Sequence, residues 1–343
     1  MREALFLRQN AEKWQQFEQD LRLQNNPDIF ADHFIDLTDD LAYSRTFYPA
    51  SHTTKYLNGL AAQFHQKIYR NKKEKSSRIW NFWQFELPYL FKQYHKQLFY
   101  SFLITIMFCF LGALSAKYDD NFLRVILGDG YVNMTNENIQ KGDPFGVYKQ
   151  GDQMSMFLFI AANNIKVAFV AYVGGILFSI GTVLLLVQNG LMLGSFEYYF
   201  FSKGLGMQSI LAIFIHGTIE ISAIIIAGCA GLILGSSILF PKTYSRWNSI
   251  LLGGKDGMKI VIGLVPFFLI AAFFEGFVTR HYQQMSVALK SSILLLSLAF
   301  IIWYFIIYPI RLHKRIEMAK NNNTDSEDQN FQSWLNKKLN LEK

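Results

Sequence analysis

The sequence is poor in the residues on which small secreted domains and cysteine-based metal sites depend. Only two cysteines occur among 343 residues, and Cys109 and Cys229 both lie within apolar segments. This pattern excludes a disulfide framework and a cysteine metal-ligand spacing, and it predicts two buried free thiols. The N-terminal stretch MREALFLRQNAEKWQQFEQD has no apolar core of the kind that a cleavable signal peptide requires, so we expect none.

Familiar catalytic signatures are also missing. The sequence has no phosphate-binding P-loop, so any step driven by ATP would need a partner chain. It has no HExxH motif of zinc hydrolases, no GxSxG nucleophile turn and no paired aspartates within an apolar segment. We therefore predict no catalytic residues, no metal centre and no cofactor, and a non-enzymatic role is favoured over an enzymatic one.

The excess of positive charge does not indicate a nucleic-acid partner. The formal net charge is +7, but the lysines and arginines are concentrated beside apolar segments, as in residues 72–78 and 311–315. At such positions basic residues set the orientation of a chain in a membrane and contact anionic lipid on the cytoplasmic face. The lipid bilayer is accordingly the first partner that we predict.

Long apolar segments fill the middle of the chain. They cover residues 98–116, 157–201, 208–240, 258–278 and 289–310, and about 20 apolar residues suffice to cross a bilayer. If residues 157–201 turn back near Gly174-Gly175 or Gly181, six crossings result and all basic clusters fall on the side of the N-terminus, as the positive-inside rule requires. A single crossing of that stretch gives five. A third possibility is that Asn189-Gly190 ends one span and residues 191–201 lie at the interface or re-enter the membrane. We predict an all-α polytopic membrane protein with five or six membrane-embedded helices, six being favoured, in the bacterial cytoplasmic membrane with a cytoplasmic N-terminus.

The flanking regions read as polar and helical. Residues 1–95 are predicted to form an N-terminal cytoplasmic or interfacial helical region, interrupted near Pro27 and Pro49 and ending in an aromatic run at 80–91 that is typical of a membrane interface. The transmembrane domain is assigned to residues 96–312, with a long exposed loop at 117–155. Residues 313–343 are predicted to be a flexible polar tail with a short amphipathic end, which either lies on the membrane or docks on the N-terminal helices.

Polar side chains inside the apolar segments are the main functional signal. His216 and Glu220 are four residues apart, so a helix places them on one face, although one ionisable group at bilayer depth costs roughly 2.5–3.5 kcal/mol. Similar interruptions complete a predicted intramembrane polar site, which consists of His216, Glu220, Glu275, Asn189, Asn163 and Asn164. Three of these positions adjoin a glycine, and we predict that Gly190, Gly217 and Gly276 allow close helix packing.

Three roles of this polar site remain open on the sequence alone. The first is structural, with polar groups that hold the helices in register. The second is a pocket or conduit of a permease-like or channel-like protein. The third is an intramembrane metal-dependent hydrolase, with His216 and Glu220 as two ligands and Glu275 or His281 as the third.

The order of these motifs resembles a known family. NNIKVAF (163–169), Gly174-Gly175, VQNGLMLG (187–194), FIHGTIEISAIIIAG (214–228) and AAFFEGF (271–277) follow one another as in the stage II sporulation protein M family of bacterial and archaeal membrane proteins. LAYSRTFYP (41–49) and LNGLAAQFHQKIYR (57–70) resemble its longer, non-sporulation branch. The resemblance covers about residues 1–310 and includes all six predicted polar positions.

The resemblance implies a multi-span protein of the cytoplasmic membrane. Short members of the family act in a complex with a peptidoglycan hydrolase and an amidase activator, but the added N-terminal region and tail distinguish this chain from them. We therefore expect a non-enzymatic scaffold or partner subunit of an envelope-associated complex, with homo-oligomerisation left open. The permease-like or channel-like protein is the alternative, and the metal-dependent hydrolase is the third hypothesis.

Overall fold

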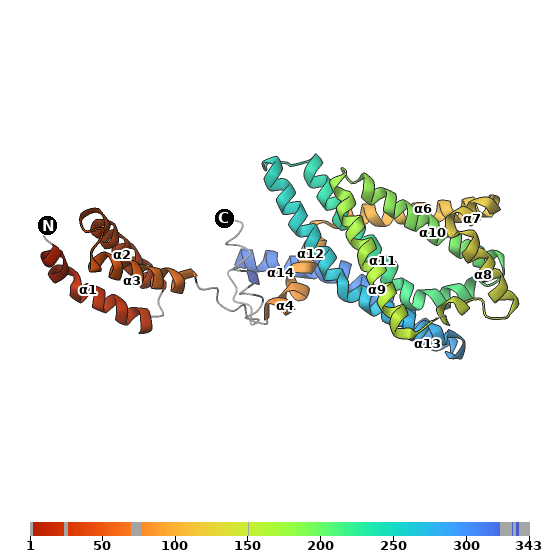
Figure 1. Cartoon of the computed structure of the whole chain (residues 1–343). Helices are drawn as coiled ribbons and strands as arrows, with labels where there is room; N and C mark the ends of the chain where they lie inside the picture. Colours follow the sequence, from red (N-terminus) through yellow and green to blue (C-terminus); the bar gives the residue numbers. More distant parts are fainter. Residues whose placement is uncertain are drawn as a thin grey trace. The chain divides into compact units, whose positions relative to one another are not determined.

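The computed structural model of the chain describes residues 3–23, 27–69, 77–149, 151–322, 331 and 334–335. Every long element in these ranges is a helix and none is a strand, which confirms the all-α prediction. The chain divides into two compact units, Met1–Ser76 and Ser77–Lys343, and each is described by itself. Figure 1 shows their helices.

Unit 1 contains three helices of similar length. They are α1 (Glu3–Leu23), α2 (Pro27–Phe47) and α3 (His52–Tyr69), so the predicted breaks near Pro27 and Pro49 are confirmed. Trp14, Leu37 and Phe64 lie in an apolar core that draws on all three helices. Trp14 also donates its indole N–H to Asp40 Oδ2 at 2.8 Å, which satisfies the one polar atom of that buried ring.

Unit 2 contains six helical elements that are long and apolar enough to cross a membrane. Within the part of the chain that the structure describes, they are His95–Tyr118, Gln153–Ile176, Ile180–Ser202, Gly206–Leu239, Arg246–Gln284 and Val287–Ala319. They comprise α6 (His95–Tyr118), α9 (Gln153–Val173), α10 (Ile180–Ser202), α11 (Gly206–Leu239), α12 (Arg246–Phe273), α13 (Val287–Ile302) and α14 (Tyr308–Asn322). This result confirms the prediction of six membrane-embedded elements.

The two helices α9 and α10 are joined by a tight apolar turn. Gly174 and Gly181 approach so closely that a Cβ on Gly174 would lie 2.7 Å from the Gly181 carbonyl carbon, and Ser179 adopts φ +69° just before α10. The turn has large exposed apolar side chains and is flanked by others, namely Val173, Ile176, Leu177, Phe178 and Ile180. The stretch 157–201 therefore folds as a helical hairpin and not as one continuous span.

Helix α11 lies at the centre of unit 2. It packs against α6, α9, α10, α12 and α13, and most of its residues are buried, as expected for a helix that other helices surround. Its own residues Ala223, Ala227 and Ala230 lie in the apolar core, and their small side chains allow neighbouring helices to come close. The polar residues His216 and Thr218 of α11 are buried as a result.

Helices α6 and α10 form a close pair. A Cβ on Gly190 would lie 2.7 Å from the backbone oxygen of Thr105, so only glycine fits at this contact. Gly194 meets the backbone of Cys109 one turn further along the same face, and together the two glycines form a GxxxG pattern.

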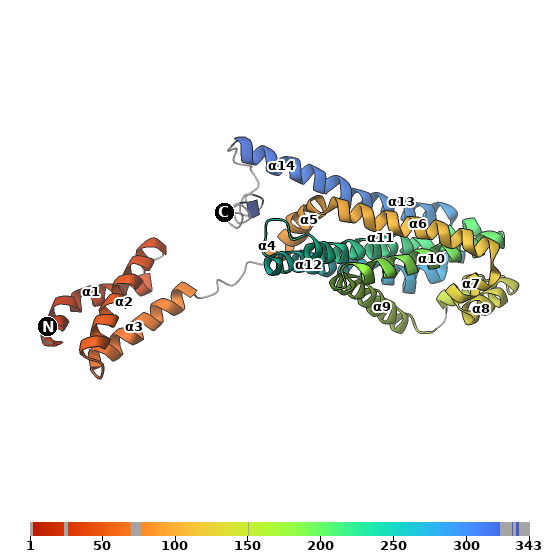
Figure 2. The same cartoon turned by 90° about the horizontal axis from the view of Figure 1, so that it is seen from above.

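The segment 117–155 differs from the exposed loop that its polar composition predicted. It contains α7 (Asp120–Leu127), α8 (Asp129–Gln140) and a short 3₁₀ turn, η2 (Gly146–Lys149). Leu123, Val132 and Phe145 are buried in a core shared with α10 and α11. Both views place α7 and α8 at the end of the bundle opposite α4 (Ser77–Asn81) and α14 (Figures 1 and 2). The cause is the spacing of Phe122, Leu123, Ile126 and Leu127, which gives α7 an apolar face within a polar sequence.

The aromatic run and the tail contact each other within unit 2. The run folds as α4, a π-helical turn η1 (Phe82–Glu86) and α5 (Leu87–Gln93). Phe85 is buried against Phe331 and Leu335 of the predicted amphipathic end. Other parts of the predicted tail, residues 323–330, 332–333 and 336–343, lie outside the described residues.

Candidate functional site

Three ionisable side chains from two helical elements meet at one point in unit 2. His216 and Glu220 project from the same face of α11. Glu275 belongs to a π-helical turn, η4 (Phe274–Val278), that continues α12. One nitrogen of His216 and one carboxylate oxygen from each glutamate lie within 4.8 Å of one another. Single π turns in long helices often occur at functional sites, and this one places Glu275 beside α11.

The imidazole of His216 is held between two neighbours. Its Nδ1 makes a 3.0 Å hydrogen bond with Oγ1 of Thr279, in the 3₁₀ turn η5 (Thr279–Gln284) that follows η4. Its Nε2 lies 3.9 Å from Oε2 of Glu275, which is too far for a hydrogen bond. His216 is 3% exposed, so the ring has little freedom to turn.

A cavity of about 300 Å³ adjoins these side chains. Its polar wall consists of Tyr131, Tyr148, His216, Glu220 and Glu275, and its apolar wall consists of Ile126, Leu127, Met192, Leu193, Phe196, Ile213 and Ile221, with Gly217 between them. α7 and α8 line one side and α10 and α11 line the other. An apolar wall with a few convergent polar groups is the usual composition of a small-ligand site.

Tyr148 covers the imidazole from outside the membrane-spanning helices. Its ring lies edge-on to His216, with the ring centroids 5.4 Å apart. Burial raises the pKa of the Tyr148 phenol well above its ordinary value, and the nearby Glu275 carboxylate raises it further. The phenol therefore stays protonated at neutral pH and can act as a hydrogen-bond donor in the cavity wall.

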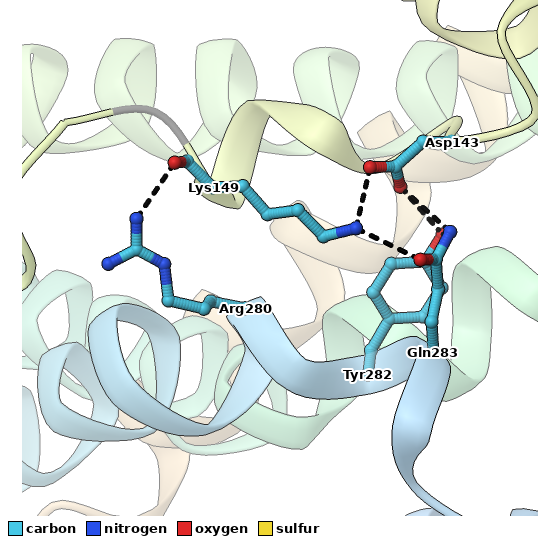
Figure 3. A network of polar contacts seen from close by, with 5 residues as sticks. All are labelled: Asp143, Lys149, Arg280, Tyr282 and Gln283. Atoms are coloured by element: carbon cyan, nitrogen blue, oxygen red, sulfur yellow. Dashed lines mark hydrogen bonds and ion pairs between the residues drawn. The ribbon is translucent and has the colours of Figure 1, made fainter.

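A polar network fixes the segment that holds Tyr148 (Figure 3). Lys149 Nζ donates to Asp143 at 2.6 Å and to Gln283 at 3.0 Å, and Gln283 Nε2 donates to Asp143 at 3.0 Å. Arg280 donates to the backbone oxygens of Lys149 and Gly151 at 2.8 and 2.9 Å. These bonds fasten η2 to η5, so the cap over the cavity and the turn carrying Thr279 form one connected structure.

The predicted asparagines divide into one that reaches the site and two that do not. The Asn164 amide neighbours the Glu220 carboxyl and is 5% exposed, whereas Asn163 is exposed. Asn189 donates to the backbone oxygen of Leu185 on its own helix at 2.9 Å and is not in the cavity wall. His281, the alternative third ligand, is exposed.

The three predicted glycines occupy different settings. Gly190 is in the close α6–α10 contact described above. A Cβ on Gly217 would meet only Ile213 and Ile221 of its own helix, at 3.5 and 3.7 Å, and Gly276 likewise has ordinary contact distances. Close helix approach is therefore seen at Gly190, while Gly217 lies in the wall of the cavity.

Sequence reasoning missed Thr279, Tyr131 and Tyr148. Thr279 is four residues after Glu275, a spacing that could have drawn attention to it. Tyr131 and Tyr148 lie in a segment with no apolar run, and only the amphipathic pattern of α7 hinted that this segment packs on the bundle.

Comparison with protein families gives two matches. The profile of the family described as stage II sporulation protein M matches residues 101–280, and a domain of unknown function matches residues 4–70. The first covers α6 to η5, including all three ionisable residues, and the second covers the helices of unit 1. Comparison with curated proteins and with solved structures gives no match.

Proposed function

Because this chain belongs to the stage II sporulation protein M family, we propose that it is a membrane subunit of an envelope-associated complex and that it binds a small polar or cationic ligand in the cavity beside His216. The observation that carries the proposal is the convergence of His216, Glu220 and Glu275 on a cavity of about 300 Å³. Polar groups that serve only to hold helices together would be paired with each other and would leave no such space.

The surroundings favour binding over conduction. Toward the far half of α11 the residues that face neighbouring helices are Ala223, Ala227 and Ala230, all in the apolar core. Among the described residues, Ser101 and Thr182 also lie along that half of α11, but both are small and donate their hydroxyls to the backbone oxygens of Ile225 and Ala171. A ligand would therefore enter and leave on the side of α7 and α8. The cavity also favours a second candidate, a permease-like protein, which would need a further conformation that opens this core.

The partner-binding role is assigned to unit 1. It is a separate compact unit and matches a different family from the membrane domain. Six crossings would return residues 77 and 319 to the same side of the membrane, and the positive-inside rule makes that side the cytoplasm. We accordingly propose that unit 1 contacts its partner in the cytoplasm, at the inner face of the bacterial cytoplasmic membrane.

Cysteine accessibility tests the cavity. In a chain whose Cys109 and Cys229 are replaced by alanine, Gly217→Cys should react with a small, charged methanethiosulfonate reagent added to membranes on the α7–α8 side. Ala223→Cys is the matched control, because it lies on the same helix but is 1% exposed within the apolar core. Equal protection of both cysteines would remove the ligand-binding proposal.

Crosslinking in native membranes tests the partner role. The full chain and a chain lacking residues 1–69 are crosslinked and purified, and a partner that depends on unit 1 should appear only with the full chain. Recovery of the full-length monomer alone would contradict the assignment to a complex.

A further inference from the structure

The ligand set at the cavity has a composition that suits a metal ion. One imidazole nitrogen and two carboxylate oxygens lie within 4.8 Å of one another, and ligands of a bound first-row metal, at about 2.0–2.2 Å from the ion, are roughly 3–4 Å apart. Small side-chain movements are enough to close this difference. We propose that His216, Glu220 and Glu275 bind one divalent transition-metal ion, Zn²⁺ or Mn²⁺. This inference rests on the proposed ligand-binding cavity and names the class of ligand.

The local charge balance requires a cation or protons. Two carboxyl groups face each other in an apolar helical bundle, and no lysine or arginine is among the described residues that line the cavity. Lys149 and Arg280, which directly follow Tyr148 and Thr279 in the chain, are bonded to Asp143, Gln283 and backbone oxygens. A dication placed between Glu220 and Glu275 cancels both negative charges, which makes the site electrically neutral at its depth in the membrane.

The orientation of His216 matches that of a metal ligand. When Nδ1–H donates to Thr279 Oγ1, the free electron pair of Nε2 points toward Glu275. A histidine that binds a metal through one nitrogen almost always donates its other N–H to a second protein group, which fixes the tautomer. The 3.9 Å separation of Nε2 from Glu275 leaves both atoms without a hydrogen bond between them, and a shared ion satisfies both.

A buried donor beside the cluster is a second, independent observation. Asn164 is 5% exposed, and its buried Nδ2 has no hydrogen bond of ordinary geometry among the described residues. Its amide makes only a loose hydrogen-bonding contact with the Glu220 carboxyl. An unsatisfied buried amide is costly. It would be satisfied by donating to a metal-bound carboxylate or to a water molecule on the ion.

The ligand types narrow the choice of ion. One nitrogen and two oxygens suit Zn²⁺ and Mn²⁺ better than they suit Cu(I), which prefers sulfur, or Ca²⁺, which takes 6–8 oxygens. Three protein ligands leave at least one position directed into the cavity, as in zinc sites that keep an open position for water. The ion would thus be accessible to exchange from the cavity and not enclosed.

Metal binding by the purified full chain tests the inference. The protein in detergent is stripped with chelator, dialysed, and titrated with Mn²⁺ under electron paramagnetic resonance and with Zn²⁺ under isothermal calorimetry. We expect about one ion per chain, with binding abolished by His216→Ala and by Glu275→Gln. Thr279→Ala removes only the partner of Nδ1, and it should weaken binding by roughly 10- to 100-fold.

A matched control separates this site from other membrane carboxylates. Glu197→Gln changes a partly buried glutamate of α10 that accepts a hydrogen bond from Ser209, outside the cluster, and should leave metal binding unchanged. Size-exclusion profiles identify any variant that fails to fold. Glu220→Asp, which keeps the charge, is then titrated with metal in place of that variant. Absence of stoichiometric binding to the wild type, or binding that Glu275→Gln and Glu197→Gln affect equally, overturns the inference. If Gly217→Cys is still labelled in that case, the ligand-binding cavity stands and only the metal is wrong.

Discussion

Replacing Glu275 by glutamine should change the thermal stability of the protein in opposite directions with and without metal. The substitution keeps the size of the side chain and removes its charge. In chelator at alkaline pH, the wild type brings two carboxyl groups together with no cation between them, so that each one that ionises is opposed by the other. In saturating Zn²⁺ the same two carboxylates are ligands, and the variant lacks one of them.

The size of the effect follows from the geometry of the cluster. Two like charges no more than 4.8 Å apart repel by at least about 3.5 kcal/mol at an effective dielectric constant of 20. Glu275→Gln removes this term, so the variant should melt several degrees higher than the wild type in chelator. Zinc should raise the melting midpoint of the wild type strongly and that of the variant little. A ligand that binds the folded state stabilises it more the tighter it binds, at a given ligand concentration.

The assay is differential scanning fluorimetry of the full chain in detergent, with Glu197→Gln as the control that keeps the cluster intact. The control should show the same zinc-induced shift as the wild type. If Glu275→Gln melts lower than the wild type in chelator, the carboxylates do not repel each other and are instead held by stabilising hydrogen bonds. That result would refute the electrostatic reasoning behind the site.

Further predictions concern packing, the cap and unit 1. Gly190→Ala should destabilise the bundle by about 1–3 kcal/mol through overpacking. Gly217→Ala should be neutral or stabilise by up to about 1 kcal/mol, because it improves helix propensity without a clash. Equal losses of stability for the two variants in thermal denaturation would contradict both expectations. Arg280→Ala removes two charged hydrogen bonds to the backbone and should speed labelling of Gly217→Cys, and an unchanged labelling rate would mean that the network does not control the cap. Trp14→Ala should cost unit 1 about 3–5 kcal/mol and make it the first part degraded in limited proteolysis, while unit 2 remains intact; degradation of both units together would show that they unfold as one. Asp152 caps α9, and its hydrogen bonds to the backbone and side chain of Ser155 lower its pKa. The stabilisation by this carboxylate is therefore present above the pKa of the unfolded chain, near 4, and is lost as the pH falls through the lower pKa of the folded chain. Asp152→Asn should remove this acid dependence in a denaturation series from pH 5 to pH 2.

The helices that cross the membrane could be predicted because each needs only a local signal. A run of apolar residues decides membrane insertion, and Gly174-Gly175 marked the turn between α9 and α10. The pairing of His216 with Glu220 was also local, since it depends on the helical repeat alone. These features follow from the sequence within one or two turns of the residues concerned.

The composition of the site could not be predicted in the same way. Glu275 reaches α11 only because of how α12 packs and widens into a π turn, and Tyr148 reaches His216 only because α7 and α8 fold back on the bundle. Asn163 and Asn164 show the limit most clearly, because they are adjacent in sequence and α9 turns one outward and the other inward. Their assignment needed the rotation of α9 about its axis, which tertiary packing sets.

The apolar turn between α9 and α10 bears on how the protein responds to bilayer thickness. A connection that contains Lys or Arg must remain at the level of the lipid headgroups, but Leu177 and Phe178, both more than half exposed, have no such requirement. A thicker bilayer can therefore engulf this hairpin, while the basic residues around α12 and α14 hold those helices at the interface. The hairpin would then slide relative to its neighbours when the lipid changes, and α10, which lines the cavity through Met192 and Phe196, would carry that movement to the site.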